Sequence, residues 1–236
     1  MRSHISLSSV PITIQVDDRL FLKDPNSSDL GKRIIRHSIE MIHEIGFEAF
    51  TFRKLAQQIN TAEPSVYRYF ENKHKLLLYL LNWYWNWMDY MLKISTANID
   101  DGAERLRAAI RVISQPIKND PTFQHIDETA LYHIVVVESS KVYLTKEVDE
   151  VNKEGLFHGY KRLCLRIADI IQEINPTYKY PRALVSTIME SSHDQKFFAE
   201  HLPSLTDISK ENLDDSTAFL TDLVMAAIGF QSRITD

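Results

Sequence analysis

The sequence predicts an all-α protein in which an amino-terminal helix-turn-helix domain is followed by a larger helical domain. Apolar residues recur at helical spacing through most of the chain after residue 28, and proline, glycine or asparagine ends these segments. No stretch after residue 97 alternates with the period of two that strands show. We therefore divide the chain into an arm (1–27), a helix-turn-helix domain (28–76) and a helical domain (77–236).

Composition and charge restrict the class of protein. The chain has 236 residues with 44% hydrophobic content, which is enough for an ordinary core. Its net charge of -5 argues against nonspecific coating of nucleic acid, but the charge is uneven. Residues 28–96 carry nine basic and seven acidic groups, whereas residues 97–236 carry 15 and 22. A mildly basic module is thus joined to an acidic one.

Cysteine usage and the amino terminus predict a cytoplasmic protein. The single cysteine, Cys164, allows no internal disulfide, and no Cys/His array predicts a zinc site. Polar residues interrupt the first apolar residues before a secretory signal forms. No metal and no cofactor is expected.

The arm is expected to form a short β element. Ile12, Ile14 and Val16 alternate with polar neighbours, and residues 19–22 could return after the two aspartates that precede them. Because an isolated hairpin is marginal in water, an ordered arm must dock on another surface. A frayed tail is the alternative.

A helix-turn-helix pattern begins after a breaker cluster at residues 24–29. The first predicted helix, 30–45, ends at Gly46. Thr51 is placed to cap a second helix, 52–59. Asn60 follows where the turn needs a residue that tolerates the left-handed conformation.

The third predicted helix, 63–70, is the candidate recognition helix for a DNA major groove. Its apolar residues are Val66, Tyr67 and Phe70, which leaves Ser65, Arg68 and Tyr69 facing outward. Asn72 is the expected cap of the next helix, and Lys73 lies in its first turn, where a cation opposes the helix dipole. A DNA phosphate would satisfy both the lysine and the free N–H groups there, with a solvated lysine as the alternative.

The most apolar segment, residues 76–92, contains all three tryptophans. It is shorter than the ~20 apolar residues of a membrane span and carries Asn82, Asn86 and Asp89. We expect a long helix buried on nearly all sides that joins the two domains. Its tryptophans, at positions 83, 85 and 87, cannot share one helical face, so one could line a ligand pocket; ordinary core is the alternative.

The remaining segments also predict helices, with a kink or a short break near Gly155 and Gly159. The predicted ranges are 102–115, 127–145, 147–174, 181–201 and 213–230. The last two helices could supply half of an intermolecular four-helix bundle, or they could be intradomain core. The stripe on the final helix consists of Leu220, Val224, Ala227 and Ile228.

Residues 30–80 resemble the TetR/AcrR family of transcriptional regulators. The residues that carry this resemblance are Gly46, Thr51, Arg53, Leu55, Ala56, Tyr67, Tyr69, Phe70, Lys73, Leu76 and Leu77. Three positions depart from the family pattern: Asn60 replaces a glycine, Ala62 a capping serine, and Glu63 a frequent lysine. Thr61 is an alternative cap for the recognition helix.

The resemblance implies a ligand-responsive regulator, expected to be a repressor, that binds a near-palindromic operator on double-stranded DNA as a homodimer. Residues 77–236 would then bind a small-molecule effector and dimerise through the last two helices. The expected DNA contacts are Thr51, Arg53, Ser65, Tyr67, Arg68, Tyr69 and Lys73. The candidate ligand-binding residues are Trp83, Trp87, His133 and His158.

Two other functions compete with this interpretation. An enzyme is not expected, because His43 and Glu44 begin a zinc-protease motif whose second histidine is replaced by Phe47, and no nucleotide-binding or nucleophile motif occurs. His193 and Asp194 could form a metal or acid–base site with His133 and His158, but isolated histidines on helices are usually surface residues or hydrogen-bonded core residues. The alternative is a helical protein-interaction module that does not bind DNA.

Overall fold

The computed structural model describes residues 13–115, 117, 119–146, 148–209, 211–212 and 214–230. These residues form helices and no strand, so the all-α prediction is confirmed. The α-helices are α1 Asp29–Ala49, α2 Phe52–Gln58, α3 Glu63–Tyr67, α4 Lys73–Thr96, α5 Gly102–Ser114, α6 Glu128–Glu138, α7 Ser140–Tyr143, α8 Val148–Lys153, α9 His158–Ile174, α10 Pro181–His201 and α11 Asp214–Ala227. Short 3-10 turns are η1 Asp18–Leu20, η2 Pro25–Ser27, η3 Pro121–Phe123 and η4 Pro203–Leu205.

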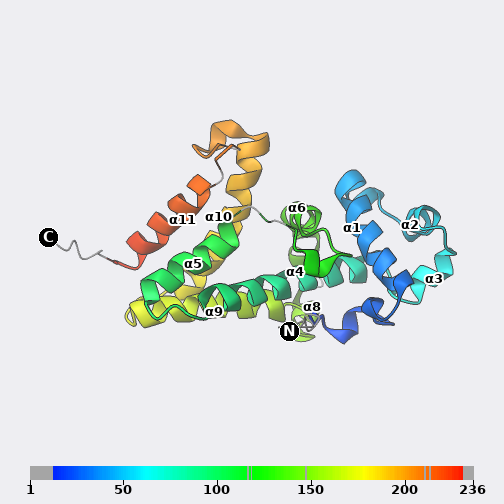
Figure 1. The fold of residues 1–236 in the computed structure, drawn as a ribbon, viewed down its shortest axis with the longest axis horizontal. Helices are drawn as coiled ribbons and strands as arrows, with labels where there is room; N and C mark the ends of the chain where they lie inside the picture. Colours follow the sequence, from blue (N-terminus) through cyan, green and yellow to red (C-terminus); the bar gives the residue numbers. More distant parts are fainter. Residues whose placement is uncertain are drawn as a thin grey trace, which may run out of the picture.

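The molecule is elongated, and α4 runs along its length (Figure 1). Helices α1, α2 and α3 lie at one end, while α5, α9, α10 and α11 gather at the other. Helix α6 packs against α1 and α4, and so bridges the two ends. The long aromatic segment is buried on nearly all sides, as predicted. Among the described helices, none is long and apolar enough to cross a membrane.

Caps and glycines set the helix boundaries. The side chains of Ser28, Thr51 and Asn72 accept from backbone N–H groups at the starts of α1, α2 and α4. Gly46 has a φ of 75°, which interrupts α1 at the predicted position before a last turn to Ala49. Gly155, with a φ of 78°, lies between α8 and α9, so the predicted break there is also confirmed.

The prediction of a β arm is wrong for residues 13–28, and Ile12 with the preceding residues lies outside the described range. The carboxylate of Asp17 accepts from Arg19 N–H, and that of Asp24 accepts from Asn26 N–H, so each closes a 3-10 turn. The arm nevertheless docks, as an ordered arm must: Ile14 and Leu20 are buried. Its turns therefore replace strand pairing.

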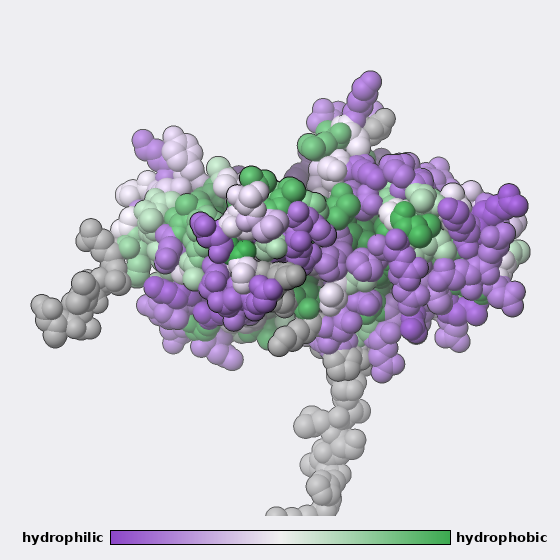
Figure 2. Space-filling view, turned by 90° about the horizontal axis from the view of Figure 1, so that it is seen from above, coloured by the Kyte–Doolittle hydropathy of each residue, from purple (hydrophilic) through white to green (hydrophobic). Residues whose placement is uncertain are grey.

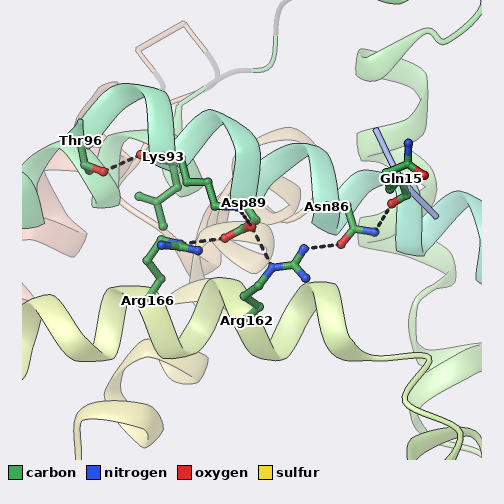
Figure 3. A network of polar contacts seen from close by, with 8 residues as sticks. Gln15, Asn86, Asp89, Lys93, Thr96, Arg162 and Arg166 are labelled. Atoms are coloured by element: carbon green, nitrogen blue, oxygen red, sulfur yellow. Dashed lines mark hydrogen bonds and ion pairs between the residues drawn. The ribbon is translucent and has the colours of Figure 1, made fainter. Parts of the chain in front are cut away.

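A polar stripe on α4 explains the residues that interrupt its apolar sequence (Figure 3). Asp89 is 1% exposed and accepts hydrogen bonds of 2.9 Å from Arg162 and Arg166 of α9, with Lys93 at 3.0 Å. One turn earlier, Asn86 accepts from Arg162 and donates to the Gln15 carbonyl of the arm, at 2.9 and 2.7 Å. The stripe thus joins α4 to α9 and to the arm.

Candidate nucleic-acid interface

The turn between α2 and α3 has the geometry of a helix-turn-helix. Asn60 adopts a φ of 50°, the left-handed conformation expected there, and Thr61 N–H donates to Ala56 O at 2.9 Å. Leu55 and Val66 are fully buried, which fixes α3 against α2. Neither Ala62 nor Thr61 caps α3 through its side chain, but Pro64 has no N–H and the Ser65 N–H donates to Ala62 O at 2.8 Å.

Four of the predicted DNA contacts lie on the surface of this unit. Thr51, Arg53, Tyr67 and Arg68 are exposed, and Ser65 is half-buried. Neither Arg53 nor Arg68 forms an ion pair with a described residue. Figure 2 shows that hydrophilic residues predominate over the end of the molecule that holds α1–α3. This end therefore presents unneutralised cations on a rigid frame.

The predicted orientations of two tyrosines are wrong. Tyr69 is 3% exposed, whereas Tyr67 is 46% exposed and only its ring edge contacts Phe52. The reason is that α3 ends at Tyr67, so helical spacing does not describe Tyr69. The Tyr69 hydroxyl shares a hydrogen bond of 2.7 Å with Ser28, and its carbonyl accepts from Leu22 N–H at 2.8 Å. Tyr69 thus anchors the arm.

Lys73 is engaged inside the protein. Its ammonium donates to the carbonyl oxygens of Phe47, Glu48 and Phe50, at 3.1, 3.2 and 3.3 Å. It also lies 4.7 Å from the centre of the Phe47 ring. The negative end of the α1 dipole offsets the unfavourable position of this cation at the start of α4. All three donors of the ammonium group are used without a phosphate.

Glu138 of α6 holds the same region from the other side. Its carboxylate is buried and accepts from Phe47 N–H at 2.9 Å. Lys141 pairs with Glu138 at 2.8 Å and with Glu48 at 3.1 Å. The interruption at Gly46 is therefore clamped by α4 and by α6. Sequence reasoning missed Glu138, because a carboxylate 91 positions from its partner leaves no local signal.

The four predicted ligand-binding residues do not form one site. Trp83 and Trp87 are buried and stack with ring centres 6.1 Å apart, but they line two different cavities. The ring centre of His133 lies 5.2 Å from that of His43 of α1, and His133 is half-buried. His158 is exposed at the start of α9.

A buried polar group that the pattern did not predict lies on α10. Lys196 is 5% exposed, donates to the Gln115 carbonyl at 3.0 Å and sits 4.7 Å from the Tyr132 ring centre. Burial lowers the pKa of Lys196 to about 8 and that of the neighbouring His193 to about 4. Among the described residues, no group of three or more histidine, cysteine or acidic side chains could hold a metal ion.

The cavity lined by Trp87 lies between α4 and α5 and has a volume of about 540 Å³. Met88, Met91, Ile99 and Val112 supply most of its apolar wall, and Arg111 is its one charged lining residue. The cavity lined by Trp83 is of similar size, about 550 Å³, but lies against α1.

Comparison with known proteins places this architecture in a class. Residues 34–80 match the family model of bacterial regulatory proteins of the tetR family. Over 44 residues the chain is 36% identical to the class C tetracycline repressor of Escherichia coli and to the class G repressor of Vibrio anguillarum. These matches cover 19% of this chain and 20% and 21% of the two repressors. The chain thus matches about a fifth of the length of these relatives.

Solved structures extend the likeness of fold to most of the chain. A protein assigned as a transcriptional regulator from Saccharomonospora viridis, solved in complex with choline, aligns with a TM-score of 0.58 at 16% identity, over 82% of this chain and 94% of that one. The ketosteroid transcriptional regulator KstR2 of Mycobacterium tuberculosis aligns at 0.54 with 14% identity, over 92% and 96%. The superantigen PfiT aligns at 0.56 with 18% identity, over 91% and 100%.

The fold and the amino-terminal unit define a two-part, all-helical protein with a helix-turn-helix at one end. Residues 34–80 match the model of the tetR family of bacterial regulatory proteins, and the solved structures share the fold of most of the chain.

Proposed function

We propose that this protein is a transcriptional regulator that binds double-stranded DNA through α2 and α3. The observation that carries the proposal is the pair of exposed arginines, Arg53 and Arg68, which lack internal ion pairs and border a helix-turn-helix. The proposed contacts are Thr51, Arg53, Ser65, Tyr67 and Arg68.

Two predicted contacts receive a different role in this proposal. Tyr69 and Lys73 position the unit, because one is buried against Ser28 and the other is bonded to the end of α1. The recognition helix depends on both for its angle to the rest of the protein. Mutation of either residue would therefore alter DNA binding through the frame.

A homodimer would present two such units to a near-palindromic operator, with half-sites about 34 Å or a multiple of it apart. The surface of α11 supports this assembly. Leu220 and Val224 are buried within the chain, whereas Phe219 and Leu223 are exposed four residues apart on its outer side. We propose that this exposed pair packs against a second copy, so that the paired surface includes α10 and α11.

A small-molecule effector would act through α4. This helix contributes residues to both tryptophan cavities, and it begins at Lys73, which is bonded to the carbonyl oxygens at the end of α1. A shift of α4 or α6 on binding would change the clamp at Gly46 and thereby the angle of α3. Such a ligand would release a repressor from its operator in the cytoplasm. The fold alone does not decide the function, since it also occurs in a protein described as a superantigen.

The deciding experiment selects bound fragments from genomic DNA of the host with the purified full chain at low salt. We expect recovery of a sequence containing two inverted half-sites. Arg68→Ala should reduce or alter this selection, whereas the matched control Lys179→Ala, an exposed cation in the helical domain, should not. Absence of any sequence-selective binding would favour the alternative of a helical protein-interaction module.

A further inference from the structure

The cavity beside Trp83 lies between the helix-turn-helix end and the helical domain. It has a volume of about 550 Å³, within the range of small-molecule sites. Helix α1 and the η3 turn both line the cavity, and α4 contributes Trp83. Its lining residues that matter here are Lys32, Arg33, Arg36, Trp83, Phe123 and His125.

The α1 wall is cationic. Arg36 pairs with Glu40 at 3.0 Å, but Lys32 and Arg33 form no ion pair with any described residue. Asp29 is the one carboxylate that lines the cavity. Since Glu40 compensates Arg36, the two unpaired cations and Asp29 leave the cavity with a small positive balance inside a chain whose overall charge is -5.

The side of the cavity near Trp83 is lined by apolar residues. Trp83 and Phe123 are 2% and 3% exposed, and their rings meet edge to face with centres 5.4 Å apart. Ile14 of the arm, which is also buried, completes this lining. Because all three side chains are almost fully covered, they shape the cavity but offer a ligand little surface of their own.

Hydrogen bonds fix the polar rim. The Asn26 side-chain amide donates to the Tyr79 hydroxyl at 3.2 Å, and its oxygen accepts from His125 Nε2 at 3.1 Å. Burial, assisted by Lys32, lowers the pKa of His125, so its ring is neutral at pH 7. The positions of these groups are therefore set before a ligand binds, which limits the entropy cost of binding.

We propose that this cavity binds a small organic anion, with its charged head on Lys32 and Arg33 and its body in the space beside Trp83 and Phe123. Because α1 and η3 both line the cavity, the bound anion would tie the helix-turn-helix end to the helical domain. That the bound anion acts as the effector rests on the proposed regulator function, whereas the binding of the anion does not. The charge distinguishes this site from the Trp87 cavity, where Arg111 is the single cation.

Fluorescence titration of the full chain with anilinonaphthalene sulfonate, an aromatic anion, tests the site. Its neutral analogue N-phenylnaphthylamine serves as the probe without charge. We expect the anion to bind more tightly than the neutral analogue. The double variant Lys32→Gln, Arg33→Gln should lower the affinity for the anion by about tenfold or more, because charge-assisted hydrogen bonds are lost. It should leave the affinity for the neutral probe unchanged.

Two further variants locate the effect. Thr122→Trp places a bulky side chain at an exposed lining position of η3 and should weaken the binding of both probes. Lys179→Gln removes an exposed cation that does not line the cavity, and it should leave the binding of both probes unchanged. Equal anion affinity in the wild type and the double variant would overturn the proposal, as would equal affinity of the wild type for the two probes.

The two proposals fail separately. Anion binding is measured on the free protein, and DNA selection is measured without the probe. A charge-dependent anion site in a protein that selects no DNA would leave this inference standing and remove the regulator function. Selective DNA binding with no anion site would do the reverse.

Discussion

Two pairs of arginines show how the same side chain serves two purposes in this molecule. Arg53 and Arg68, at the helix-turn-helix end, are exposed and form no ion pair with described residues. Arg162 and Arg166 on α9 are also partly exposed, at 47% and 37%, but both donate to the carboxylate of Asp89. The difference lies in the partner and not in the exposure.

This difference separates structural charge from functional charge. A carboxylate that is 1% exposed needs cations, because an unpaired buried charge is costly. Asp89 thus holds three cations in fixed positions, whereas Arg53 and Arg68 at the helix-turn-helix end and Lys32 and Arg33 on the α1 wall pair with no described carboxylate. An unpaired cation on a rigid element is therefore the better marker of a binding surface here.

The strongest way to break the comparison is Asp89→Asn, which keeps the shape and removes the charge. We expect the free energy of unfolding to fall by about 3 kcal/mol, since breaking a buried ion pair leaves unpaired charges. Chemical denaturation measures the change. The control Asp169→Asn, an exposed carboxylate on α9, should change stability by less than about 0.5 kcal/mol. Equal stability of the two variants would contradict a structural role.

The same carboxylate makes stability depend on acid. Burial acts to raise the pKa of Asp89, but hydrogen bonds from Lys93, Arg166 and Arg162 outweigh it and lower the pKa below 3.8. A lowered folded pKa means that the contribution is complete above the unfolded pKa of about 3.9 and is lost as pH falls through the folded value. Asp89→Asn should therefore flatten the loss of stability in this acid range.

The second test exchanges the two arginine classes. Arg68→Ala should cost about 2 kcal/mol of discrimination at one base pair if it reads a base, with little change in stability. Arg162→Ala should instead lower stability and leave DNA affinity unchanged. Quantitative binding to the selected site and to single-base variants of it measures the first effect, and denaturation measures the second. A uniform loss across sites would assign Arg68 to phosphate.

Much of the fold could be predicted because its signals are local. Caps at Thr51 and Asn72, the break at Gly46 and the left-handed Asn60 each depend on a few neighbouring residues. The burial of α4 follows from its composition. The arm was predicted incorrectly because alternation of apolar residues over a few positions cannot compete with two aspartates that close 3-10 turns.

The site was less predictable because its decisive contacts join distant segments. Lys73 reaches the carbonyl of Phe47, and Glu138 reaches the N–H of the same residue, over 26 and 91 positions. No helical spacing reports such contacts. The predicted pocket residues also do not share one pocket. Trp83 and Trp87 are one turn apart on α4, but Trp83 lines a cavity next to α1 and Trp87 lines a cavity next to α5. Helical spacing places residues on a face but cannot say which element covers it.

The smallest expected effect concerns Lys73, which belongs to neither class of arginine. It is a cation next to the helix-turn-helix, but its hydrogen bonds are to carbonyl oxygens within the protein. Lys73→Met keeps the apolar stem and removes three hydrogen bonds to carbonyls at the end of α1. We expect a loss of about 1 kcal/mol in stability, measured by denaturation. The control Lys75→Met removes a neighbouring cation whose only ion pair is a 3.8 Å surface contact with Glu154, and it should have less effect.

The salt dependence of DNA binding distinguishes the two roles of Lys73. A lysine that neutralises a phosphate releases a counterion, so its removal would reduce the slope of log affinity against log salt by about one. A lysine that holds α1 carbonyls releases none, and Lys73→Met should then lower affinity with the slope unchanged. A slope reduced by about one would return Lys73 to the phosphate contacts and place it with Arg53 and Arg68.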